Sequence, residues 1–275
     1  MTQLEEWVGK TRSLTEIIDE RQAGLLAATL DQPIPLSGEP LPSCWHWAWF
    51  NDALSASQLG RDGHPKRGDF IPPVALPRRM WAGGNIEFIN PVRIGSTIRK
   101  ISTIKDVSEK QGNSGKLCIV SIGHQLVENE MLCIDETQNL VFREDPGPGT
   151  PATLEIDPPA VPDQSFEIHT DPVMMFRYSA LTFNGHRIHY DVDYARDVEG
   201  YPDLVFHAPL TATTLCRLAQ EMLGEVDIKS FHYRATAPLF CNQTVGFSGK
   251  HEEGKLRLWA QTPAGGQAML AEAIG

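Results

Sequence analysis

The chain has 275 residues, a formal net charge of −11 and a pI near 5.3. This acidic balance excludes a nucleic-acid partner, because there is no basic stripe to displace the counterions of phosphate groups. The length is sufficient for a sizeable core, and we expect two domains rather than one.

The cysteines and the start of the chain indicate a cellular compartment. Residues 1–10 include Glu5 and Glu6 and lack the apolar segment of a signal peptide, and no run of eighteen apolar residues follows. The cysteines are odd in number, widely spaced and without a C-x-x-C pair, which indicates buried thiols in a reducing cytoplasm. They are Cys44, Cys118, Cys133, Cys216 and Cys241. We therefore expect a cytoplasmic protein with no membrane partner.

Two segments stand out in the first half. Tryptophans alternate in Trp45–Phe50, which could stack an adenine ring, although packing in a core or an interface is the favoured interpretation. Further on, Pro73–Trp81 is interpreted as a shortened helix that Pro77 interrupts.

A proline-rich stretch at residues 145–164 predicts a linker between a degenerate first half, residues 1–144, and a second half, residues 165–275. Each half has helical segments and loops first and strands later. Pro91–Ile98 matches Pro238–Val245, and Gly115-Lys116-Leu117 matches Gly254-Lys255-Leu256, each opening a predicted strand. These matches indicate a duplicated α+β unit in which a bent antiparallel sheet wraps a helix.

The second half contains the strongest helix signal and the densest polar segment. A buried helix of about four turns is predicted from Pro209 to Gly224, because apolar residues recur on one stripe between a proline start and a glycine stop. Upstream, Phe176–Asp191 concentrates Asn, His, Arg, Tyr and Asp side chains after a short apolar helical pattern. A loop that displays polar groups from a rigid base is typical of a functional site.

These segments resemble a known family. Tyr178–Asp191 followed by Val205–Thr211 resembles the hydratase motif of the MaoC-like hotdog hydratases. Leu76–Gly84 together with Asn184–Asp191 is similar to the double-hotdog branch, which includes mitochondrial hydroxyacyl-thioester dehydratases and bacterial 3-methylfumaryl-CoA and itaconyl-CoA hydratases. The likeness extends over roughly residues 40–275.

The resemblance implies a fold and an activity. We expect an α+β double hotdog and a hydro-lyase that adds water reversibly to a branched dicarboxylic enoyl-CoA, giving citramalyl-CoA as in itaconate degradation. The acyl-CoA is the substrate and no cofactor or metal is expected. A homodimer is expected. The alternatives are an (R)-3-hydroxyacyl thioester dehydratase for monocarboxylic chains, a hotdog acyl-CoA thioesterase, and a catalytically silent acyl-CoA sensor or assembly partner.

The family pattern implies catalytic roles. It places an Asp five residues before a His, and here His189 matches the His while Asn184 occupies the Asp position. Because an amide accepts no proton at neutral pH, His189 is expected to act as base and then acid, with Asn184 orienting the water. The amide of Ala208, at the helix start, is expected to bind the thioester oxygen. In the first half, His64 follows Leu59 at the same spacing, so one active site is expected.

Other residues near the motif are candidates for substrate contact: Arg177, Arg187, Tyr178, His186, Arg78, Arg79 and Trp81. Arg177 or Arg187 either receives a substrate carboxylate or is a solvated charge, and His186 either acts directly or is satisfied by backbone. Tyr178 and Asp191 are expected to orient His189, and His207 to support the helix start. A metal held by His186, His189 and Asp191 is disfavoured, because a fourth ligand is missing.

Overall fold

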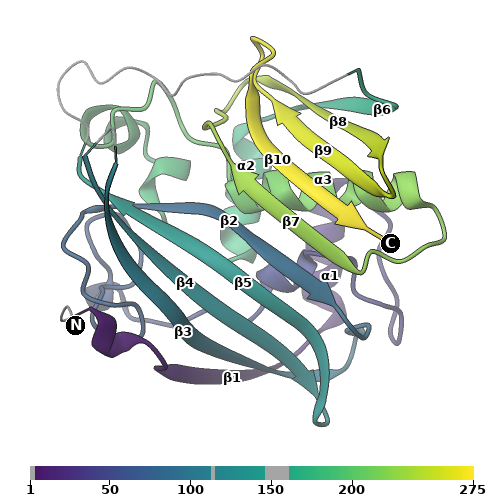
Figure 1. Cartoon of the computed structure of the whole chain (residues 1–275), viewed down its shortest axis with the longest axis horizontal. Helices are drawn as coiled ribbons and strands as arrows, with labels where there is room; N and C mark the ends of the chain where they lie inside the picture. The colour runs from purple at the N-terminus through teal and green to yellow at the C-terminus, as the bar shows by residue number, and fades with distance from the viewer. Residues whose placement is uncertain (1–3, 113–114, 146–160) are drawn as a thin grey trace.

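The computed structural model describes residues 4–112, 115–145 and 161–275. Within them, ten strands form one antiparallel sheet in the order β1-β3-β4-β5-β2-β7-β10-β9-β8-β6 (Figure 1). The strands are β1 (Thr11–Ile17), β2 (Arg78–Phe88), β3 (Thr97–Gly112), β4 (Gly115–Glu128), β5 (Met131–Arg143), β6 (Gln164–His169), β7 (Ser230–Ala235), β8 (Thr244–Glu252), β9 (Lys255–Gln261) and β10 (Gln267–Ile274). The α-helices are α1 (Glu20–Leu30), α2 (Pro172–Leu181) and α3 (Ala208–Leu223).

The sheet has an internal symmetry. Read from each edge to the centre, the first half runs β1-β3-β4-β5-β2 and the second runs β6-β8-β9-β10-β7, and β2 pairs with β7 where they meet. The repeated segments are structurally equivalent. Arg93 and Phe240 each form an isolated bridge, and each is followed by a turn into the third strand of its half, β3 or β8. Most of the predicted linker, residues 146–160, lies outside the described residues.

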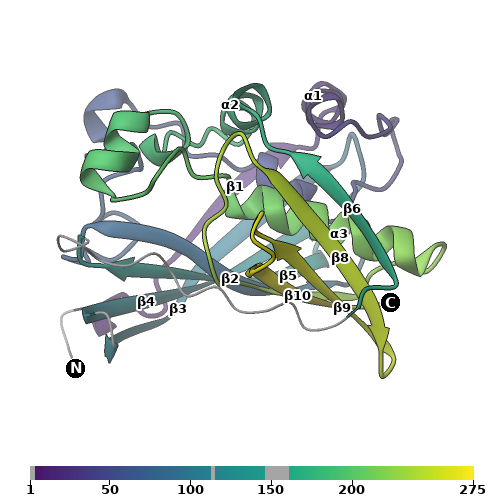
Figure 2. The same ribbon diagram turned by 90° about the horizontal axis from the view of Figure 1, so that it is seen from above.

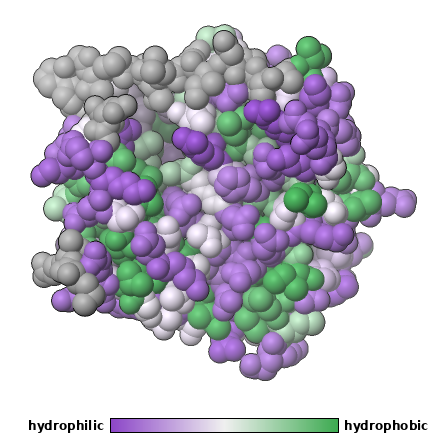
Figure 3. All heavy atoms as spheres, viewed as in Figure 1, coloured by the Kyte–Doolittle hydropathy of each residue, from purple (hydrophilic) through white to green (hydrophobic). Residues whose placement is uncertain are grey.

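The helices cover one face of the sheet. Figure 2 shows α3 next to the sheet, with α1 and α2 in a further layer beyond it. α3 packs against β2, β7, β8, β9 and β10, and α1 contacts α2. The opposite face, seen in Figure 3, is a mixture of hydrophilic and hydrophobic side chains. The main core therefore lies between α3 and the sheet.

α3 is the helix predicted from the second half, and it begins one residue earlier, at Ala208. Leu210, Leu215 and Leu218 are each 0–1% exposed, and burying such a side chain stabilises the fold by about 1.5–3 kcal/mol. Buried threonines also lie on α3, and Thr214 donates its hydroxyl hydrogen to the Leu210 carbonyl. Gly224 ends the helix at a φ of 67°, as its position predicts.

Two expectations about the order of elements are wrong. Pro73–Trp81 is not a shortened helix: residues 73–77 have no regular secondary structure and Arg78 begins β2, which pairs with β5. Prolines cannot donate helical hydrogen bonds, and the guanidinium of Arg67 donates to the carbonyl groups of Val74 and Pro77, which holds this segment in place. In addition, a strand, β1 or β6, precedes the α-helices of each half, whereas strands were expected only after them.

The aromatic cluster packs in the core, which confirms the favoured interpretation. Trp45 and Trp49 are 5% and 3% exposed, and the Trp47 indole N–H donates to Glu136 at 2.9 Å. Burial is the largest single effect and opposes ionisation of Glu136, but the hydrogen bond to His46 and the charges of His46, His124 and Lys100 together outweigh it and lower its pKa to about 2. All five cysteines are free and buried, as expected. No helix in the described residues is long and apolar enough to cross a membrane.

Candidate active site

A cavity of about 2280 Å³ lies between the loops of the first half and the α2–α3 segment of the second. It is larger than the 300–1,000 Å³ typical of sites for drug-sized ligands. The structure brings most of the predicted site residues to its wall: Arg78, Arg79, Trp81, Tyr178, Asn184, His186, His189 and Ala208. Arg177 and Arg187 do not line it.

His189 lies in a short 3₁₀ turn, Arg187–His189, and is 8% exposed. Its Nδ1 lies 2.7 Å from the carbonyl oxygen of Val205. A carbonyl oxygen only accepts, so Nδ1 carries the proton and Nε2 presents a lone pair. Burial lowers the pKa of His189 to about 4, so the imidazole is neutral at physiological pH.

His189 belongs to a row of four imidazoles, which we call the histidine row: His64, His186, His189 and His207. Neighbouring ring centroids are separated by 4.4 Å, 5.4 Å and 3.7 Å along this order. Burial lowers the pKa of all four, most strongly for His186 and His207. His207 shares a hydrogen bond with the Ser179 hydroxyl at 2.8 Å and is the N-cap residue of α3, although its side chain makes no capping hydrogen bond.

Asn184 lies five residues before His189 and lines the same cavity. Its Oδ1 accepts the backbone N–H of His186 at 3.0 Å. This bond fixes the loop between Asn184 and His189, and it occupies one lone pair of the oxygen that was expected to orient water. The Nδ2 group has no acceptor among the described residues, so it is the part of Asn184 left for a ligand.

The start of α3 lies at the cavity wall. Within the described residues, the Ala208 N–H has no hydrogen-bond acceptor, as is usual for the first amides of a helix. Ala208 and Pro209 both line the cavity. The helix terminus adds a partial positive charge at this point, which favours a developing negative charge on a ligand oxygen.

The predicted substrate residues of β2 separate into two kinds. Arg78 donates through Nε to Glu199 at 2.6 Å, which neutralises its charge. Arg79 has no hydrogen-bond acceptor among the described residues, and burial lowers its pKa to about 10, so it remains charged. Trp81 stacks on Tyr233 with ring centroids 4.5 Å apart. Of the two arginines, Arg79 is therefore the cation left for an anionic ligand group.

Other predicted residues are engaged elsewhere. Arg187 donates Nε and Nη2 to Asp191, at 2.9 and 2.6 Å, and Arg177 is exposed on α2. Neither Asp191 nor Tyr178 contacts His189 by a hydrogen bond in the described residues. The group that orients His189 is instead the carbonyl of Val205. Sequence spacing did not identify it, because backbone acceptors leave no signature in the sequence.

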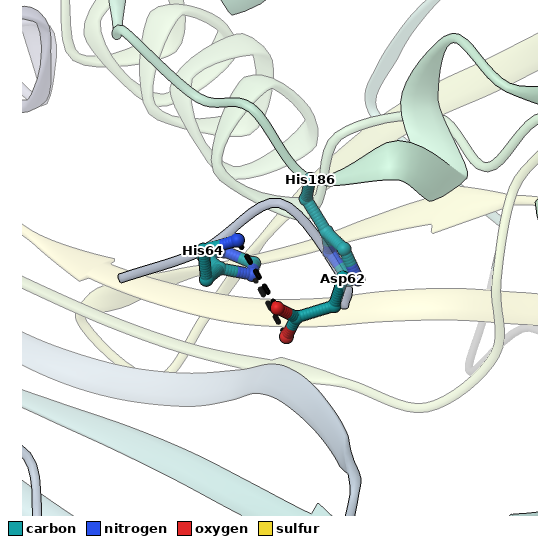
Figure 4. A group of neighbouring side chains, drawn as sticks. All are labelled: Asp62, His64 and His186. Carbon is teal, nitrogen blue, oxygen red and sulfur yellow. Dashed lines mark hydrogen bonds and ion pairs between the residues drawn. The ribbon is translucent and has the colours of Figure 1, made fainter. Parts of the chain in front are cut away.

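Two acid–base residues come to the site from the first half and were missed. Figure 4 shows the carboxylate of Asp62 pointing at His64, with the ring of His186 beside them. The Asp62 carboxylate accepts the His64 backbone N–H at 3.1 Å and lies 3.3 Å from its Nδ1. The only signal was the sequence Asp62-Gly63-His64, in which two titratable groups flank a flexible residue.

The loop at Gly63 docks directly on the motif loop. The backbone N–H of Arg187 donates to the Asp62 carbonyl at 2.9 Å. Gly63 has a φ of +86°, and a Cβ at this position would be 1.9 Å from the carbonyl oxygen of Gly185. Only glycine therefore permits this contact.

Gly63→Ala is expected to separate the two loops. We expect a loss of about 1–3 kcal/mol in the free energy of unfolding, because the new methyl group meets backbone atoms. Gly254→Ala is the matched control, since Gly254 also has a positive φ but has nothing within 4 Å of the added Cβ. Chemical denaturation of both variants measures the difference. Equal losses would show that the positive φ alone matters and would contradict this assignment of the contact.

Comparison with known proteins identifies the class. HtdX from Mycobacterium tuberculosis has the same fold, with a TM-score of 0.71 and 16% identity over 96% of this chain and 99% of that one. Another M. tuberculosis protein, described as a double hotdog, aligns with a TM-score of 0.57 and 10% identity over 97% of this chain and 95% of that one. The expected α+β double hotdog is confirmed.

The sequence comparisons add the family. Residues 44–241 match hydroxyacyl-thioester dehydratase type 2. A protein of Chloroflexus aurantiacus named mesaconyl-C(4)-CoA hydratase is 43% identical over 268 residues, which is 96% of this chain and 95% of that relative. The chain belongs to the hydroxyacyl-thioester dehydratase type 2 family, and it is a MaoC-like hydro-lyase, as expected.

Proposed function

We propose that the protein hydrates a branched dicarboxylic enoyl-CoA to citramalyl-CoA. The preferred substrate in this proposal is 3-methylfumaryl-CoA rather than itaconyl-CoA. The observation that carries the chemistry is that His189, whose Nε2 has a lone pair, lines the same cavity as Ala208, whose N–H has no acceptor among the described residues. The choice of substrate is supported by the 43% identical relative. Mesaconic acid is methylfumaric acid, so its C4 thioester is 3-methylfumaryl-CoA.

The proposed reaction uses groups that the cavity wall provides. The oxygen of a water molecule bonds to C3 of the substrate as Nε2 of His189 takes one of its protons. The π electrons of the double bond move toward the thioester oxygen, where the Ala208 N–H and the α3 terminus stabilise the negative charge. A proton delivered to C2 then completes the product, and dehydration follows the same path in reverse.

Arg79 is proposed to meet the free carboxylate of the substrate. It lines the cavity with Asn184 and His189, and Arg78 is already paired with Glu199. A guanidinium can donate two parallel hydrogen bonds to a carboxylate. Arg79 is half-buried, and the partial loss of water around its guanidinium makes an anionic partner favourable.

The substrate proposal predicts a clear preference. We expect kcat/KM for 3-methylfumaryl-CoA to exceed that for crotonyl-CoA, which has no free carboxylate, by about 10²-fold or more, because the shorter substrate leaves the half-buried guanidinium of Arg79 without an anionic partner. Loss of enoyl-thioester absorbance with 3-methylfumaryl-CoA and crotonyl-CoA measures this ratio. For itaconyl-CoA, whose double bond is not conjugated with the thioester, formation of citramalyl-CoA is followed by chromatography. A preference for crotonyl-CoA would contradict the proposed dicarboxylic substrate. Release of free thiol would indicate a thioesterase.

The second candidate is a 3-hydroxyacyl-thioester dehydratase for monocarboxylic chains. The family match favours it, since the family is described by that activity. Apolar side chains on the cavity wall, among them Phe206, Leu239 and Met269, could hold an alkyl chain. The crotonyl-CoA measurement separates the two candidates directly.

A further inference from the structure

The loop of the first half reaches the active site with an acid–base pair of its own. We propose that His64, held by Asp62, is a second proton-transferring residue of this site and supplies the acid–base group that Asn184 cannot. His64 then delivers the proton to C2 of the substrate while His189 receives the proton from water. This inference rests on the proposed hydratase function and deepens it.

The geometry places His64 in the same cavity as His189. Both residues line it, and the ring of His186 lies between them, 4.4 Å from His64 and 5.4 Å from His189. The docking of Gly63 against Gly185 fixes this arrangement. His64 therefore belongs to the active site even though it lies more than a hundred residues earlier in the chain.

The partner of each imidazole distinguishes their roles. Within the histidine row, only His64 has a carboxylate partner, Asp62, whereas His189 bonds to a carbonyl and His207 to a hydroxyl. A carboxylate that accepts the Nδ1 hydrogen stabilises an imidazolium and holds its Nε2–H toward the opposite side. His64 is therefore the member of the row best suited to carry a proton, and His189 is the member best suited to receive one.

The charged groups around His64 determine the direction in which its pKa is shifted. Burial and the positive charge of Arg79 lower the pKa of His64, and its hydrogen bond to Asp62 opposes them. The charged groups that act on His64 are Asp62, Arg67 and Arg79, and His64 in turn acts on the pKa of His186 and His189 in the motif loop. Removing Asp62 leaves only groups that disfavour the imidazolium, so the pKa of His64 should fall further.

The proposed step is balanced. An O–H bond of water breaks and a C3–O bond forms, with the proton moving to Nε2 of His189. The carbon–carbon π bond breaks, and its electrons form the new C2–H bond with the proton that leaves Nε2 of His64. After product release, the proton on His189 returns to His64, with the neutral ring of His186 between them or through solvent. No other reactant is required.

A shared cation is a different use of the same residues. The side chains of Asp62, His64 and His186 offer ligand atoms that all lie within 4.8 Å of one another. The guanidinium groups of Arg67 and Arg79 act on His64 with positive charge, and Arg79 also acts on His186. These positive charges disfavour binding of a divalent cation by Asp62, His64 and His186. The surroundings therefore favour proton transfer as the function of these residues.

The experiment compares the pH dependence of hydration in the full-length wild type, His64→Gln and Asp62→Asn, with 3-methylfumaryl-CoA as substrate. We expect wild-type kcat/KM to fall as pH rises through the pKa of His64. Asp62→Asn should move this alkaline limb to lower pH, and His64→Gln should abolish it with about a 10²-fold loss of kcat at the optimum. His232→Gln, at an exposed position on β7, is the matched control and should leave the profile unchanged.

The outcomes are distinguishable. A purely structural role for His64 would lower activity equally at every pH and keep the alkaline limb, which would overturn the inference while leaving the hydratase intact. A wild type that hydrates no enoyl-CoA would overturn the proposed function and this inference together. Retention of one zinc ion per chain by the wild type after dialysis, lost in His64→Gln, would assign the pair to a metal and overturn proton transfer. Thermal melting confirms that each variant is folded.

Discussion

Replacement of His189 by glutamine is expected to lower kcat/KM for hydration by about 10³-fold, because general acid–base groups contribute about 10²–10⁴-fold. Glutamine has a similar volume and can still donate a hydrogen bond to the Val205 carbonyl, so the turn at Arg187–His189 should persist. The lost property is the lone pair of Nε2. The effect should therefore appear mainly in kcat, since the amide cannot take a proton from water.

The measurement is a steady-state hydration assay on His189→Gln beside His232→Gln, which also exchanges one imidazole for an amide but lies exposed on β7. A loss confined to His189→Gln, with unchanged melting temperature, supports the proposed role of His189. Wild-type kcat in His189→Gln would contradict it and would leave His64 as the first candidate for the base. Increased KM with unchanged kcat would indicate that His189 only contributes to binding.

The elements with local signals could be predicted from the sequence. The helix α3 combines a proline start, a one-sided apolar stripe and a glycine stop, and each of these acts through neighbours a few residues away. The repeat around Pro91 and Pro238 was also recognisable, because equivalent turns need similar residues at similar spacings. The helix expected at Pro73–Trp81 was not found, since pairing of β2 with β5 and β7 is a long-range effect that local patterns do not contain.

The candidate site could be predicted only in part. His189 and Asn184 share one loop, so their spacing along the chain shows their proximity in space. His64 could not be found from spacing. The search for an Asp five residues before it assumed that each half forms a separate active site. In the fold, the contact of Gly63 with Gly185 brings the first half into the site of the second. Sequence alone also did not show that the guanidinium of Arg187 donates to Asp191.

Removal of one backbone hydrogen at the start of α3 is expected to have the second large effect. Ala208→Pro deletes the N–H proposed to bind the thioester oxygen, and loss of one such donor typically costs about 10²–10³-fold in kcat. The backbone allows the change, because His207 is already extended, with φ −66° and ψ 122°, as a residue before proline must be. Proline also suits the first turn of a helix. The fold should therefore be retained.

Ala208→Gly is the matched control, since it keeps the N–H and opens space at the same position. The proline ring could also obstruct the cavity wall, and the two causes separate in the kinetic constants. Loss of the oxyanion donor lowers kcat with little change in KM, because the hydrogen bond strengthens only as charge develops on the oxygen. Obstruction raises KM and weakens binding of citramalyl-CoA. Full kcat in Ala208→Pro would show that the thioester oxygen is bound by another group, and the start of α3 would then act only through its partial charge.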